Sequence, residues 1–184
     1  FGPFYIVFLT YAFIFFKSYK LILSFGGTRK QFMLSSFISA FLYITAGTIV
    51  LTTLHYIGKA IFQNGYVFHM ADILNDANPA MYFWVDFLWL FILFGIGMFA
   101  QVINFNLGAL RTLILAAVII LGSVAAYFFM DLTPLFEFII NDYLLFLHLL
   151  ALGSIVLLTA SYFMMRNAPL ERGDRKIFKA NTVN

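Results

Sequence analysis

Two histidines lie within apolar stretches of the sequence, where side chains able to bind a metal are rare. His55 falls near the end of one stretch and His148 near the start of another, whereas His69 lies in a polar connection. A pair of histidines inside a membrane can ligate a haem iron, so His55 and His148 are candidates for electron transfer. A histidine that only makes a hydrogen bond is the commoner case, and we weigh it as the stronger interpretation.

Three further polar residues stand in or beside one apolar stretch. Asp86 lies near its start, and Gln101 and Asn104 lie near its end. Polar side chains inside a membrane are costly and often mark a pathway for substrates or ions, so all three are candidates for lining one. Each also has a simpler interpretation, an interfacial acid at Asp86 and helix capping or interface contacts at Gln101 and Asn104.

The sequence contains no pattern that predicts a catalytic centre. It has no cysteine, which excludes disulfides, thiolate metal ligands and a cysteine nucleophile. It also has no His-Glu-x-x-His pair and no glycine-rich phosphate-binding loop ending in Lys-Ser or Lys-Thr. We therefore expect no catalytic site and no metal site in this chain.

The elements that position these residues are predicted to span a membrane. Of the 184 residues, 63% are hydrophobic and 10% are charged, and the mean hydropathy is +0.95. Soluble domains have about a quarter of their residues charged, so a soluble core could not bury this much apolar surface. Five apolar stretches occupy residues 4–16, 32–57, 83–103, 112–130 and 143–165. The last four are long enough to cross about 30 Å of hydrocarbon as helices.

These stretches predict an all-α integral membrane protein with a single helical bundle over residues 1–184. Lipid offers no partner for free backbone groups, and the stretches lack the alternation of a membrane barrel. The chain opens with Phe1-Gly2-Pro3 and not with methionine. We therefore expect the native start to be missing, and a cytoplasmic N-terminus would require a sixth helix upstream of the five that are visible.

Charge is distributed unevenly over the connections, which predicts the orientation. The first connection, the third connection and the tail carry the bases Lys17, Lys20, Arg29, Lys30, Arg111, Arg166, Arg172, Arg175, Lys176 and Lys179. The other two carry one base, Lys59, and the acids Asp72, Asp76, Asp131, Glu137 and Asp142. By the positive-inside rule, the segments 17–31 and 166–184 face the cytoplasm of a multi-pass cell-membrane protein. Membrane lipid is then a partner and nucleic acid is not.

Smaller signals concern the connections and the helix contacts. A short interfacial helix is expected within residues 67–74, and another is expected to open at Thr133-Pro134. Small residues let membrane helices approach closely. We expect such contacts at three pairs, Ser36 with Ala40, Gly95 with Gly97, and Gly122 with Ala126. Packing within the bundle is the favoured interpretation, and a dimer interface or a pathway lining is the alternative.

The connection 17–31 has a pattern of its own. The apolar residues between Tyr19 and Phe25 favour a short helix with one apolar face, and Gly26-Gly27 should end it because glycine tolerates a positive φ. Thr28 and Gln31, three residues apart, predict a capping box at the start of the next helix. The segment is therefore predicted to be a helix, a sharp turn and a new helix.

This pattern resembles the cytoplasmic coupling segment of type-2 ABC transporter permeases. Residues 21–34, LILSFGGTRKQFML, have the hydrophobic pair, the small turn residues and the Thr-Arg step typical of that family. Residues 162–169, YFMMRNAP, are similar to the ending that follows its last span. Two features depart from the family pattern, with Lys17 and Lys20 where an acid is usual and Gly26 in place of proline.

The resemblance implies a permease subunit of a bacterial ABC exporter. Its ATPase-coupling residues would be Leu23, Ser24, Phe25, Gly26, Gly27, Thr28 and Arg29. They would contact a separate ABC ATPase subunit, which holds the ATP and Mg²⁺, while a second permease chain of the same or another kind completes the pathway. The substrates implied are peptides, drugs or amphipathic compounds.

Two other functions remain open at this point. One is a haem-binding electron-transfer subunit that uses His55 and His148, which a reduced-minus-oxidised absorption spectrum would reveal. The other is an accessory or sensory membrane protein, which would have no coupled ATPase and would tolerate substitution at Gly26, Gly27 and Arg29.

Overall fold

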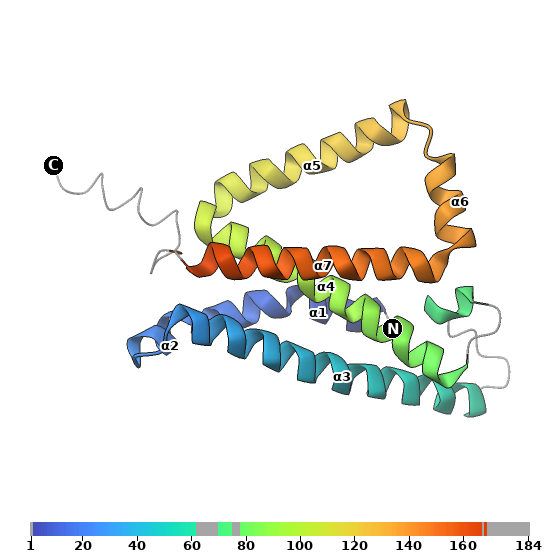
Figure 1. Ribbon diagram of the computed structural model, residues 1–184, viewed down its shortest axis with the longest axis horizontal. Coiled ribbons are helices and arrows are strands. Elements are labelled where there is room, and N and C mark those ends of the chain that lie inside the picture. Colours follow the sequence, from blue (N-terminus) through green and yellow to red (C-terminus); the bar gives the residue numbers. More distant parts are fainter. Residues whose placement is uncertain (1, 62–69, 75–77, 167, 169–184) are drawn as a thin grey trace.

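The structure is a computed structural model that describes residues 2–61, 70–74, 78–166 and 168 (Figure 1). In this part of the chain all regular structure is helical. The elements are α1 (Gly2–Phe15), η1 (Phe16–Ser18), α2 (Tyr19–Ser24), α3 (Arg29–Ile61), η2 (Met70–Ile73), α4 (Pro79–Leu107), α5 (Ala109–Phe129), α6 (Thr133–Asn141) and α7 (Tyr143–Arg166).

Five helical segments are long and apolar enough to cross a membrane, which confirms the predicted all-α membrane bundle. They are Tyr5–Ser24, Arg29–Ile61, Pro79–Leu107, Ala109–Phe129 and Tyr143–Arg166. The first segment is longer than the apolar stretch 4–16 because η1 and α2 continue it past Lys17 and Lys20. The protein is therefore a multi-pass membrane protein.

Most of the bases and acids in the described connections lie at opposite ends of the bundle. Figure 1 shows α2, the α4–α5 junction and the end of α7 at one end, which we call the basic end. The end of α3, η2 and α6 lie at the other, which we call the acidic end. The alternation of charge along the sequence is thus a separation of charge in space, apart from Lys59 near the end of α3.

The helix α4 lies at the centre and packs against α1, α3 and α7. Half of the residues in its most apolar window are buried, more than in any other spanning helix. A Cβ atom at Gly97 would lie 2.0 Å from the carbonyl oxygen of Leu9 in α1, and one at Gly95 would lie 2.8 Å from Cβ of Ser154 in α7. The two glycines therefore admit α1 and α7 into close contact with α4, as the small-residue pattern predicted.

An aromatic cluster joins η1, α2, α3 and α4 near the basic end. The ring of Tyr19 lies 4.9 Å from that of Phe105 and 5.0 Å from that of Phe32, measured between centroids. Phe16 packs edge-on against Phe32 at 5.3 Å. Tyr19 and Phe32 are fully buried. Aromatic pairs at these separations add to the stability that burial provides, so α2 is fastened to the bundle.

The helix α5 stands apart from the others (Figure 1). It leaves α4 at Gly108, whose φ is +86°, and it buries none of its side chains. A Cβ at Gly122 would meet nothing within 4 Å, so the expected within-bundle contact of Gly122 and Ala126 is wrong. The reason is that α5 diverges from α4 immediately after the turn. Ser36 and Ala40, by contrast, are buried.

The connections at the acidic end agree with the sequence where they are described. The helix α6 begins at Thr133, as Thr133-Pro134 predicted. The backbone N–H of Thr133 donates to Asp131 at 3.0 Å, and hydrogen bonding to Thr133 lowers the pKa of the Asp131 carboxyl. Of the helix expected within 67–74, residues Met70–Ile73 form η2 and residues 67–69 lie outside the described part of the chain.

We expect Gly97→Ala to destabilise the protein, because its Cβ would overlap the backbone of α1. Overpacked cores lose about 1–3 kcal/mol, and here the obstructing atom is a carbonyl oxygen that cannot rotate away. The measurement is unfolding of the purified protein in detergent. Gly122→Ala is the matched control and should leave stability unchanged or slightly raised. Equal losses in both variants would contradict the close α1–α4 contact.

Candidate functional site

The turn between α2 and α3 is closed by backbone hydrogen bonds. Gly27 N–H donates to the Ile22 carbonyl at 3.0 Å, and Gly26 N–H donates to the Leu23 carbonyl at 3.1 Å. With φ of +85° at Gly26, this is the Schellman arrangement that ends helices at glycine. The predicted break at Gly26-Gly27 is confirmed. A Cβ at Gly27 would lie 2.7 Å from the Ile22 carbonyl oxygen, so this position also requires glycine.

The first turn of α3 carries the predicted capping box. Thr28 N–H donates to Oε1 of Gln31 at 2.9 Å, and Gln31 N–H donates to Oγ1 of Thr28 at 3.2 Å. The two residues thus satisfy backbone groups that would otherwise lack a helical partner. Both sides of the turn are therefore fixed by local bonds.

The side chains of α2 divide between the bundle and the surface. Tyr19 is buried, and Ile22 and Leu23 pack against the same core. Phe25 is 83% exposed and Leu21 is 56% exposed. The predicted single apolar face is therefore incomplete, because Phe25 lies beyond the last turn of α2 at the tip of the segment. We call Leu21 and Phe25 the apolar tip.

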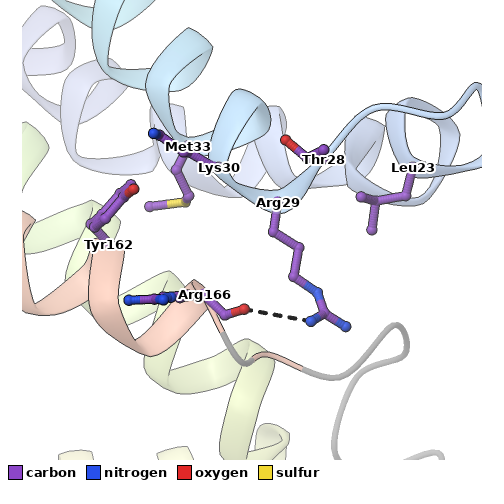
Figure 2. A pocket seen from close by; sticks show the side chains of 7 residues that line it. All are labelled: Leu23, Thr28, Arg29, Lys30, Met33, Tyr162 and Arg166. Carbon is purple, nitrogen blue, oxygen red and sulfur yellow. Dashed lines mark hydrogen bonds between the residues drawn. The ribbon is translucent and has the colours of Figure 1, made fainter.

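A cavity of about 420 Å³ adjoins the turn, and Figure 2 shows the side chains around it. Its lining comprises Leu23, Thr28, Arg29, Lys30, Met33, Tyr162 and Arg166. It thus brings together the start of α3 and the end of α7, the two segments that carry the family resemblance. We call it the basic cavity, because three of its seven lining residues are bases and none is an acid.

Arg29 links the turn to α7 across this cavity. Its Nη1 donates to the carbonyl oxygen of Arg166 at 3.4 Å, as the dashed line in Figure 2 marks. The last carbonyls of a helix lack intrahelical partners and carry partial negative charge, so a guanidinium is stabilising there. Sequence reasoning placed both arginines at the same membrane face but gave no signal for this contact, because 137 positions separate them.

The three pathway candidates do not form one site. Asp86 is fully buried and accepts a hydrogen bond from the hydroxyl of Tyr5 at 2.8 Å, so it joins α4 to α1 inside the bundle. Its carboxyl group is therefore held between two helices and is not exposed on the surface of the bundle. Gln101 and Asn104 lie about 22 Å and about 27 Å further along α4 by helical rise. There Nδ2 of Asn104 donates to Oε1 of Gln101 at 3.2 Å.

The two membrane histidines lie on different sides of α4. The ring of His55 stacks on Tyr82 with centroids 4.6 Å apart, whereas Nε2 of His148 accepts a hydrogen bond from Nε1 of Trp84 at 3.1 Å. Residues two apart in a helix point about 200° apart, so Tyr82 and Trp84 hold the histidines on opposite faces. Nδ1 of His148 also donates to the Leu144 carbonyl. This arrangement offers no common position for a haem iron between His55 and His148.

Comparison of the chain with models of known protein families, with curated proteins and with solved structures finds no match. Within the described residues, no three His, Cys, Asp or Glu side chains gather in a way that could hold a metal ion. The geometry of the turn and of the basic cavity is therefore the main guide to function.

We expect Gly27→Ala to loosen the turn, because the added Cβ would collide with the Ile22 carbonyl. The readout is limited trypsin digestion in detergent, with cleavage after Arg29 and Lys30 becoming faster than in the native protein. Gly58→Ala serves as the control, since a Cβ there meets nothing within 4 Å. Unchanged cleavage in Gly27→Ala would show that the turn does not depend on this close contact.

Proposed function

We propose that this chain is the permease subunit of an ABC exporter and that residues 17–31 couple it to a separate ATPase subunit. The observation that carries the proposal is the apolar tip, held on a turn that is fixed on both sides. The two segments with the family resemblance, residues 21–34 and 162–169, also contribute side chains to one cavity. ATP and Mg²⁺ would be bound by the partner subunit.

The apolar tip has the character of a protein-binding surface. It lies at the basic end, which the positive-inside rule assigns to the cytoplasm. Phe25 is 83% exposed, so no other part of the described chain covers it. Burying a phenylalanine side chain contributes about 1.5–3 kcal/mol. A groove on an ATPase subunit would supply that burial.

The turn is rigid, so it would pass a movement of the ATPase on to the spanning helices instead of bending. Its backbone bonds are satisfied at Gly26, Gly27, Thr28 and Gln31. Behind it, the aromatic cluster joins α2 to α4, and Arg29 bonds the end of α7. A partner that displaces the apolar tip would therefore displace the first, third and last spanning segments together.

The position of α5 supports a second permease chain as the other partner. This apolar helix buries none of its side chains against the rest of its own chain. A second copy, or a related permease, packed along α5 would complete a pathway between two bundles. In this arrangement the C-terminus is cytoplasmic and the substrate is a peptide, a drug or another amphipathic compound.

Phe25→Asp should separate the permease from its ATPase. Losing about 1.5–3 kcal/mol of burial corresponds to roughly a 10- to 100-fold weaker complex. The experiment purifies the tagged, full-length protein from its host in mild detergent, identifies co-purified subunits by mass spectrometry and measures ATP hydrolysis. We expect an ATPase with a phosphate-binding loop to accompany the native chain and to be lost from Phe25→Asp.

Ile140→Asp is the matched control, because Ile140 is 72% exposed but lies on α6 at the acidic end. It should retain the ATPase. Absence of any ATPase from the native preparation, or equal loss in both variants, would reject the proposal. An absorption spectrum of the same sample tests for haem, and a haem band would favour electron transfer instead.

A further inference from the structure

A second cavity lies beside the basic cavity and has a different lining. It measures about 450 Å³ and is lined by Phe37, Phe91, Ile155, Leu158, Thr159, Tyr162 and Phe163. None of these residues is charged, and Thr159 uses its hydroxyl to donate to the Ile155 carbonyl at 2.8 Å. Tyr162 belongs to both cavities. We call the second cavity the apolar groove.

The two cavities follow the same faces of the same two helices. On α7, Ile155, Thr159, Tyr162 and Arg166 succeed one another at intervals of three or four residues, which places them on one face. On α3, Met33 of the basic cavity and Phe37 of the apolar groove are four residues apart. The cavities therefore lie end to end along α3 and α7. Helical rise from Ile155 to Arg166 gives a length of about 16 Å.

We propose that the basic cavity and the apolar groove form one binding site for an anionic phospholipid. Its phosphate would lie against Arg29, Lys30 and Arg166, and one acyl chain would lie along the apolar groove. Guanidinium and ammonium groups are the usual partners of phosphate oxygens. The cavity lies where the spanning helix α3 begins and α7 ends, and we place the lipid headgroups at this depth.

The charges of the site favour an anionic phospholipid over a zwitterionic lipid or a soluble anion. The site has three bases and no acid at one end and only neutral side chains along the rest. A zwitterionic lipid would bring a fourth cation to a place that already holds three. A soluble anion would leave the apolar groove unused. The inference does not depend on the proposed coupling role, although Arg29 belongs to both features.

The experiment measures lipid binding to the full-length protein in detergent. Dioleoyl phosphatidylglycerol and dioleoyl phosphatidylcholine are titrated separately, bound lipid is counted by native mass spectrometry and the shift in Tm is recorded. We expect phosphatidylglycerol to bind at least tenfold more tightly and to raise Tm more. The double variant Lys30→Gln, Arg166→Gln should remove that preference, whereas Lys17→Gln, Arg111→Gln, which neutralises two bases outside the cavity, should retain it.

The apolar groove is tested separately with Thr159→Trp. This exposed residue lines the groove, so an indole there would occupy the space of the acyl chain and weaken phosphatidylglycerol binding severalfold. Leu149→Trp is the control, because Leu149 is half exposed on α7 about 15 Å away by helical rise. Each variant should keep the lipid-free Tm of the native protein, which separates a loss of binding from a loss of folding.

Three results would overturn the proposal. Equal loss of phosphatidylglycerol binding in the two double charge variants would mean that the lipid is attracted to the bases of this end in general and not to the cavity. Equal protection by inorganic phosphate, with no effect of Thr159→Trp, would mean a free phosphate site. Loss of the ATPase from Lys30→Gln, Arg166→Gln with unchanged lipid binding would assign the cavity to the partner protein. Failure of the Phe25→Asp test, by contrast, would leave this lipid site in place.

Discussion

The carbonyl oxygen of Leu9 occupies the space that a side chain on Gly97 would need, and Ser154 does the same at Gly95. Lipid tails are as apolar as leucine, so membrane helices associate through close packing and not through exclusion of water. These two contacts, on nearly opposite faces of α4, set where α1 and α7 lie. The aromatic cluster, the turn after α2 and the basic cavity all depend on helices placed in this way.

The features that sequence reasoning predicted are those with local causes. The capping box needs only Thr28 and Gln31, and the end of α2 needs only a glycine with a positive φ. The presence of the spanning helices follows from the length and hydropathy of the apolar stretches. The contacts it missed join distant segments, such as Tyr5 with Asp86 and Arg29 with Arg166. Nothing in the residues next to Asp86 indicates that a tyrosine from another helix will bond it.

The helix α5 shows a different limit of the sequence. Its composition predicts that it spans a membrane, and its small residues predict a contact. Composition cannot say whether the contact is made by the same chain, by another chain or by lipid, since all three are equally apolar. The turn at Gly108 excludes this contact with the same chain, because it directs α5 away from the helices that pack around α4.

The basic end reverses the usual distribution of side chains. The apolar tip, Leu21 and Phe25, is exposed just before the turn. Arg29, Lys30 and Arg166 line a cavity that continues into the apolar groove. Exposed apolar groups are costly in water, and clustered bases attract an anion. A protein groove would cover the tip, and a phosphate with its acyl chain would occupy the cavity and the groove. The two features can thus be occupied at once, and through Arg29 the lipid would stiffen the same connection by which, in the proposed function, the tip would transmit movement to α7.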